Sequence, residues 1–181
     1  MSSTSTEDGG CDTPTSSSVY HESMRDLSLS DSIAMHSKNC PWKGRSFIIR
    51  DPHTKLVIGL QKGELRLVPE HSGHGCGIYW SCVESDKMLL GFQNVVSGTF
   101  IGYKNNGILS SALFSAQYSL HGESESFCVR AHPDGGYVLL VKQACGFLPV
   151  QICMDRWLMV GTNQDEGVAW EFIRVKDEHA I

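Results

Sequence analysis

One segment of the chain holds residue types that bind zinc. His71, His74 and Cys76 follow one another closely, and Cys82 lies a little further along. Imidazole and thiolate are good zinc ligands, and a structural site takes four ligands in a tetrahedron. This spacing matches no common zinc module, and glycines alternate through 73–77 as in a loop. We therefore interpret the segment as a solvated loop, keep His71, His74 and Cys76 as the metal-ligand candidates, and expect no bound metal or cofactor.

The same segment places a thiol beside an imidazole, which is the pairing of a cysteine nucleophile with its base. Cys76 and His74 are close in sequence, but such a pair also needs a third group to orient the imidazole and an oxyanion hole. No pattern supplies either, and the chain has no G-x-S-x-G turn, phosphate-binding loop or dinucleotide fingerprint. The sequence predicts a protein that is not an enzyme.

Two further polar segments, 51–53 (Asp-Pro-His) and 132–136 (His-Pro-Asp-Gly-Gly), have the composition of tight turns. Pro presets φ, Asp hydrogen-bonds to nearby backbone, and Gly supplies positive φ. We interpret both as hairpin tips with no catalytic role. Nearby basic residues, such as Arg50 and Lys55, are interpreted as part of a solvated surface.

The elements that must position these residues begin near residue 43. Residues 1–40 contain 15 Ser or Thr, six acidic and two basic residues, so their net charge is −4. Such a segment cannot bury enough apolar surface to offset the entropy of ordering it. We expect a disordered, acidic Ser/Thr-rich tail at 1–42, followed by one domain at 43–181 in which acidic and basic residues nearly balance.

The domain consists of short apolar or alternating runs separated by turn residues, with no long amphipathic pattern. Runs of this kind, rich in Val, Ile, Phe, Tyr and Trp, predict an all-β domain of about twelve strands. The expected strands are 46–50, 56–60, 64–68, 79–84, 88–92, 99–103, 108–112, 126–130, 137–141, 147–152, 157–160 and 169–175.

These runs repeat three times. Trp80, Phe127 and Trp170 each lie in an aromatic strand, and successive ones are separated by 47 and 43 residues. Segments 56–67 and 99–110 also match, because each has an apolar strand containing Gly followed by a second apolar strand. One four-stranded unit cannot bury its apolar face alone, so three such units predict a β-trefoil. A β-sandwich or two-sheet roll is the alternative fold. The expected repeats are roughly 45–85, 86–133 and 134–176.

Apolar residues of these strands are expected to fill the barrel. Trp42 and Trp157 are expected to be buried or covered by the tail rather than to mark a contact surface. The expected core residues are Ile48, Leu56, Ile58, Leu65, Trp80, Val83, Leu89, Ile101, Ile108, Phe127, Val129, Val138, Leu140, Leu158, Trp170 and Phe172.

Charge and cysteine content limit the cellular compartments and the classes of binding partner that the sequence favours. The net charge of −5 argues against a general nucleic-acid binder, which needs basic residues for phosphate contacts. No apolar run approaches the roughly 18 residues of a membrane-spanning helix. Seven cysteines, an odd number, and an N-terminus without a basic or apolar block predict reduced thiols in the cytoplasm. We expect a monomer that binds neither nucleic acid nor membrane.

The repeated pattern resembles a known family. The Ile-Gly strand followed by a second apolar strand (56–67 and 99–110), with Trp or Phe closing each repeat, is similar to the fascin-like β-trefoil of actin-crosslinking proteins. The resemblance covers roughly 45–176, and the third repeat departs from it at Pro149. It implies a protein-interaction module with filamentous actin or another cytoskeletal partner. No filament-binding residue is carried over, because none of the family's binding residues maps onto a motif in this chain.

A ligand- or carbohydrate-binding β-trefoil is the alternative function. Ricin-type lectins have the same architecture and carry a Gln-x-Trp signature, and no such triplet occurs in this chain. Fold alone does not select between the two functions, because function resides in sites and loops.

Overall fold

The computed structural model describes residues 39–61, 63–71, 77–103, 114–118 and 120–175. No helix within these ranges is long and apolar enough to cross a membrane. The described elements are twelve strands and one 3₁₀ helix. Their bounds are β1 Ser46–Arg50, β2 Leu56–Gln61, β3 Glu64–Pro69, β4 Trp80–Glu84, β5 Leu90–Asn94, β6 Phe100–Tyr103, β7 Phe114–Tyr118, β8 Phe127–Ala131, β9 Tyr137–Gln143, β10 Gly146–Ile152, η1 Met154–Arg156, β11 Leu158–Val160 and β12 Ala169–Arg174.

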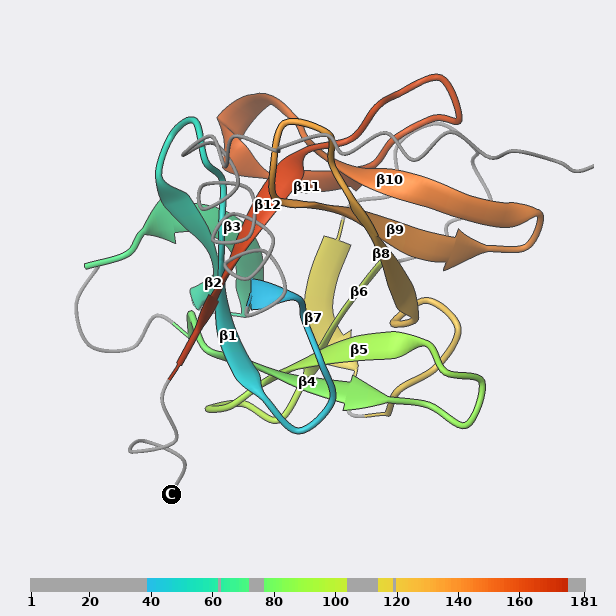
Figure 1. Cartoon of the computed structure of the whole chain (residues 1–181). Helices are drawn as coiled ribbons and strands as arrows, with labels where there is room; N and C mark the ends of the chain where they lie inside the picture. Colours follow the sequence, from blue (N-terminus) through green and yellow to red (C-terminus); the bar gives the residue numbers. More distant parts are fainter. Residues whose placement is uncertain (1–38, 62, 72–76, 104–113, 119, 176–181) are drawn as a thin grey trace, which may run out of the picture.

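Six of the strands close into a barrel (Figure 1). β1 pairs with β4 and β12, β5 pairs with β4 and β8, and β9 pairs with β8 and β12, always antiparallel. The ring therefore runs β1-β4-β5-β8-β9-β12 and returns to β1. The other six strands form three hairpins, β2–β3, β6–β7 and β10–β11. Three units of four strands around a closed ring make a β-trefoil, and the fold class predicted from the sequence repeat is confirmed. Closure of the ring removes strand edges that would otherwise be free to pair with another chain.

Strand positions follow the predicted runs closely, with one exception in the second repeat. The expected strand at 108–112 lies outside the described residues, and the seventh strand is β7. In the third repeat, Pro149 is buried within β10 and lies opposite Leu140 of β9. Its carbonyl accepts the N–H of Gly161 at 2.8 Å. A proline therefore does not prevent this strand from pairing.

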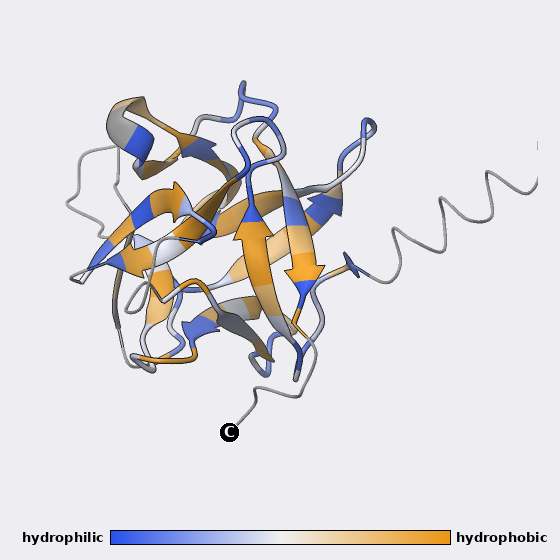
Figure 2. Cartoon of the chain, turned by 90° about the vertical axis from the view of Figure 1, so that its left-hand side faces the viewer, coloured by the Kyte–Doolittle hydropathy of each residue, from blue (hydrophilic) through white to orange (hydrophobic). Residues whose placement is uncertain are grey.

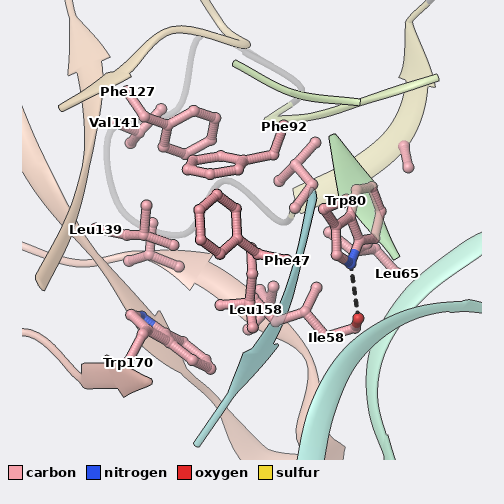
Figure 3. Close-up of a cluster of buried hydrophobic side chains, with 14 of the residues drawn as sticks. Phe47, Ile58, Leu65, Trp80, Phe92, Phe127, Leu139, Val141, Leu158 and Trp170 are labelled. Carbon is pink, nitrogen blue, oxygen red and sulfur yellow. Dashed lines mark hydrogen bonds between the residues drawn. The ribbon is translucent and has the colours of Figure 1, made fainter. Parts of the chain in front are cut away.

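The barrel interior is aromatic (Figure 3). The ring of Phe172 contacts two other aromatic rings, with centroids 5.8 Å from that of Phe47 and 5.7 Å from that of Phe92. Trp80 and Trp170 are fully buried in the same cluster. Hydrophilic residues collect at the turns and strand ends, whereas the middles of many strands are hydrophobic (Figure 2). The core thus holds the ring rigidly and leaves the turns free to carry polar chemistry.

The core predicted from the sequence assigns some residues to the wrong face of their strand. Phe47 and Ile49 point into the barrel, whereas Ile48 belongs to a second cluster with Val57 and Val68 on the other side of β1. Residues next to one another in a strand point to opposite faces, and both faces of β1 are buried here. Apolar alternation therefore could not identify the interior face. Of the other expected core residues, Ile108 lies outside the described residues. Five more are only half-buried: Leu56, Val83, Leu89, Val129 and Leu140.

The two tryptophans that were not assigned to the core, Trp42 and Trp157, differ in exposure. Trp42 is 59% exposed, so the prediction that it is buried is wrong. Trp157 is half-buried, and the Arg66 guanidinium lies 4.2 Å from its ring centroid. Cys40, which lies within the segment expected to be tail, packs against the barrel cluster.

Candidate functional site

A hollow of about 500 Å³ with both polar and apolar lining lies where the β1–β2 turn, the β8–β9 turn and β12 meet. Its size is within the range of small-molecule sites, roughly 300–1,000 Å³. The polar side chains that line it are those of Asn39, Arg50, His53, His132, Asp134 and Glu171. They come from the first repeat, the third repeat and the turn that joins the second repeat to the third, and the closed ring brings them together because β12 pairs with β1 and β9.

The β1–β2 turn is organised by a buried carboxylate. Asp51 is only 2% exposed and accepts hydrogen bonds from the backbone N–H groups of His53 and Thr54, at 3.1 and 3.2 Å, and from the Thr54 hydroxyl. Burial alone would raise the pKa of Asp51, but these hydrogen bonds outweigh it and the pKa is lowered from its ordinary value. The Asp-Pro-His sequence thus forms a fixed turn that places the exposed His53 at the rim.

The β8–β9 turn forms the opposite wall. The N–H of Asp134 donates to Nδ1 of His132 at 3.2 Å, and the Asp134 side chain is 92% exposed. Because Nδ1 accepts, neutral His132 carries its proton on Nε2 and is a donor there. Gly136 has φ +76°, and a Cβ at this position would lie 2.8 Å from the carbonyl oxygen of Ala169. Glycine is required here for the turn to lie directly against β12.

Charges at the hollow are already paired. Arg50 Nε lies 2.7 Å from a Glu171 carboxylate oxygen, and its guanidinium lies 3.5 Å from Glu70. Lys55 is 3.8 Å from Glu171. The hollow is also lined by the half-buried apolar residues Pro52, Ala169 and Ile173. The arrangement offers hydrogen-bond donors and acceptors around a hollow without a strong net charge.

The residues singled out as metal ligands are not assembled by the described structure. His71 is exposed just after β3, whereas His74 and Cys76 lie outside the described residues. Cys82 is buried in β4, and burial, with smaller contributions from Glu84 and Cys40, raises the pKa of its thiol to about 12. No group of three metal-binding side chains occurs within the described ranges. The metal-site candidates therefore remain sequence predictions, and Cys82 serves as a small apolar core residue.

A second polar cluster lies next to β6 and β8. Nε2 of His121 lies 3.3 Å from the Ser126 hydroxyl, but that hydroxyl donates to the Gly122 carbonyl at 2.7 Å and Ser126 is buried. The ring of His121 stacks on Phe100, and burial lowers the pKa of the imidazole. Glu125 is also buried, and its carboxylate accepts the Gly122 N–H. The pair is thus bonded inside the protein, and a buried hydroxyl is not placed to meet a substrate.

Sequence reasoning identified the right turns but gave them no role beyond turn chemistry. The sequence predicts hairpin tips at His53, His132 and Asp134 and a solvated surface at Arg50, and all four residues line the hollow. A usable signal is present, because two His-containing turns adjoin β1 and β9, the two strands that flank β12 in the closed ring. Their convergence depends on ring closure, which no local pattern specifies.

No family model and no curated protein sequence matches this chain. Solved structures match by fold. A ricin B-like lectin from Macrolepiota procera in complex with lactose is 12% identical with a TM-score of 0.59, and the match covers 74% of this chain and 98% of that one. The Rhizoctonia solani agglutinin is 18% identical with a TM-score of 0.58, covering 74% and 97%. The designed threefold-symmetric protein ThreeFoil is 12% identical with a TM-score of 0.57, covering 72% and 99%. At these identities the likeness concerns the fold.

Proposed function

We propose that this chain is a non-enzymatic β-trefoil module that binds a carbohydrate in the hollow between the β1–β2 turn, the β8–β9 turn and β12. The observation that carries the proposal is the composition of that hollow. The imidazoles of His53 and His132, the carboxylate of Asp134 and the Arg50–Glu171 pair line it together with half-buried apolar residues such as Pro52 and Ile173. Sites of this kind combine apolar lining with a few convergent polar groups.

The charge balance favours a neutral polyhydroxylated ligand. Arg50 is bonded to Glu171 and lies near Glu70, so an incoming phosphate or sulfate would have to compete with carboxylates that are already in place. A sugar hydroxyl donates and accepts at the same oxygen, and it therefore fits a rim where donors and acceptors alternate. The exposed Asp134 carboxylate supplies an acceptor, and Nε2 of His132 supplies a donor.

The fold comparisons support the same function by analogy, since two of the similar structures are described as a lectin and an agglutinin. This chain lacks the Gln-x-Trp signature of ricin-type lectins. Its sugar contacts would therefore come from the turn residues described above rather than from that triplet.

The test is a glycan array probed with the full chain, followed by calorimetric titration of a positive sugar, with lactose included as a defined probe. Asp134→Ala removes a side chain that is almost wholly exposed, so the fold should survive. We expect at least a tenfold loss of affinity. Asp86→Ala is the matched control, because Asp86 is exposed in the β4–β5 turn, the counterpart of the β8–β9 turn one repeat earlier. An array without specific sugar binding, or full affinity in Asp134→Ala, would overturn the proposal.

A second candidate is a protein partner, and a separate surface favours it. Tyr79, Val95 and Val96 are 40%, 50% and 79% exposed, and the Val95 N–H donates to the Tyr79 carbonyl at 3.0 Å. Exposed apolar groups that adjoin one another are typical of protein contacts. Under this hypothesis the chain is a fascin-like module that binds filamentous actin or another cytoskeletal protein in the cytoplasm. Co-sedimentation with actin filaments tests it: a Val96→Asp variant should pellet less than wild type, and wild-type protein that stays in the supernatant refutes it.

A further inference from the structure

A second hollow, of about 420 Å³, lies on the other side of the β8–β9 turn. It is lined by Arg130 from β8, Glu166 from the loop before β12, and Val138 from β9. Ala131 and Pro133 also line it and are exposed, so the hollow combines apolar surface with polar groups. This is the same combination that characterises the first hollow.

The loop that carries Glu166 is fixed by its own hydrogen bonds. The Asp165 carboxylate accepts the backbone N–H and the hydroxyl of Thr162, and the Asp165 N–H donates to the Thr162 carbonyl. Gly167 follows with φ +89°, and a Cβ there would lie 2.5 Å from a Val138 methyl carbon. The loop therefore lies directly on β9, which holds Glu166 beside this second hollow.

The two hollows share one wall. His132 and Asp134 line both of them. The turn is held by hydrogen bonds between the backbone groups of His132 and those of Gly135 and Gly136, each 3.0 Å long. The exposed Asp134 carboxylate thus stands on a fixed crest between the hollows, within reach of a ligand that crosses from one to the other.

The polar groups of the second hollow differ from those of the first in one respect. Arg50 and Glu171 are ion-paired with each other, whereas neither Arg130 nor Glu166 forms an ion pair within the described residues. A guanidinium offers several N–H donors and a carboxylate offers acceptors, so both remain available to hydroxyl groups of a ligand.

We propose that the carbohydrate is a linear oligosaccharide of at least two units, which crosses the His132–Asp134 crest and places one unit in each hollow. This inference rests on the proposed function and names its ligand class. A single ring can occupy only one hollow at a time. Units joined by a glycosidic bond occupy both, and the second contact then forms at a high effective concentration, which raises affinity without any new site.

The test compares mono- and oligosaccharides that share a terminal sugar. Calorimetric titrations use galactose against lactose, N-acetylglucosamine against its β1,4-linked dimer and trimer, and glucose against maltotriose and cellotriose. For the series that binds, we expect the oligosaccharide to bind at least tenfold more tightly than its monosaccharide. In the Arg130→Ala/Glu166→Ala double variant this ratio should fall to about one, and in Asp86→Ala it should persist. Circular dichroism and thermal melting establish that each variant is folded.

The outcomes separate this inference from the proposed function. Equal affinities for mono- and oligosaccharide in the wild type overturn the two-hollow ligand and leave carbohydrate binding standing. A ratio that persists in the double variant places the second unit elsewhere and also overturns the inference. Absence of binding by every sugar tested refutes the proposed function, and the inference with it.

Discussion

The two buried tryptophans of the barrel occupy equivalent strands but differ in hydrogen bonding. Trp80 donates its indole N–H to the Ile58 carbonyl at 2.8 Å, as the dashed line in Figure 3 shows. The indole nitrogen of Trp170 is buried and has no hydrogen-bond partner among the described residues. Both side chains are fully buried in the same cluster. Replacement of each by phenylalanine therefore compares two similar losses of volume with opposite changes in hydrogen bonding.

The expected magnitudes differ clearly. Replacement of the indole by the smaller phenyl ring lowers the free energy of unfolding of each variant by roughly 1–2 kcal/mol. This is a part of the roughly 3–5 kcal/mol that full truncation to alanine would cost. Trp80→Phe also loses a buried hydrogen bond worth about 1 kcal/mol. Trp170→Phe instead removes an unpaired buried N–H, whose desolvation costs about 1–3 kcal/mol. We expect Trp80→Phe to be the less stable variant by about 2 kcal/mol.

Urea unfolding followed by far-ultraviolet circular dichroism measures this difference. With an m-value of about 2 kcal/mol per molar urea for a domain of this size, the midpoints of the two variants should differ by about 1 M. Equal midpoints, or a lower midpoint for Trp170→Phe, would refute the reasoning. That result would mean that the Trp170 indole finds a hydrogen-bond partner in solution or that cavity terms dominate both sites.

Three further predictions follow from buried or strained positions. Burial lowers the pKa of His121 below its ordinary 6.5. As the pH falls through 6.5, the unfolded chain therefore takes up a proton that the folded chain does not. The free energy of unfolding then decreases by up to about 1.4 kcal/mol per pH unit until the pKa of His121 in the folded state is reached. Unfolding midpoints at pH 7.5 and 5.5 should differ more in wild type than in His121→Gln, and an equal difference would contradict the assignment. Gly98→Ala should lower stability by about 1 kcal/mol, because Gly98 has a left-handed φ of +71° with open space around it. Gly136→Ala should lower stability by about 2 kcal/mol more, because its Cβ would meet the Ala169 carbonyl. Similar thermal midpoints for the two variants would show that the β8–β9 turn shifts to accommodate the Cβ. Met88 is exposed and has a left-handed φ of 60°. Met88→Gly should stabilise the protein by about 0.5 kcal/mol, because the relief of backbone strain exceeds the cost of the greater entropy of the unfolded chain. A lower melting temperature for the variant would contradict this prediction.

Local patterns in the sequence were enough to predict the architecture. Aromatic strands around Trp80, Phe127 and Trp170 recur at nearly constant spacing, and a four-stranded unit has an apolar face that only two further copies can cover. Strand positions also follow from local runs, because Val, Ile and aromatic residues bounded by Gly, Pro and Asp form short strands in most contexts. The sequence could not decide which face of β1 points inward, because Phe47, Ile48 and Ile49 are all apolar and all buried.

The candidate site was decided by tertiary structure. His53, Asp134 and Glu171 are separated by tens of residues, and each has an ordinary local role as turn or strand residue. They meet because β12 pairs with β1 and β9, which closes the ring and brings the β1–β2 turn close to the β8–β9 turn. Gly136 then allows the β8–β9 turn to lie against β12. The short-range periodicity of the sequence determined the repeating unit. The hollow instead arises from strand pairings between distant parts of the chain, which depend on how the three units close into a ring and not on the sequence of any single unit.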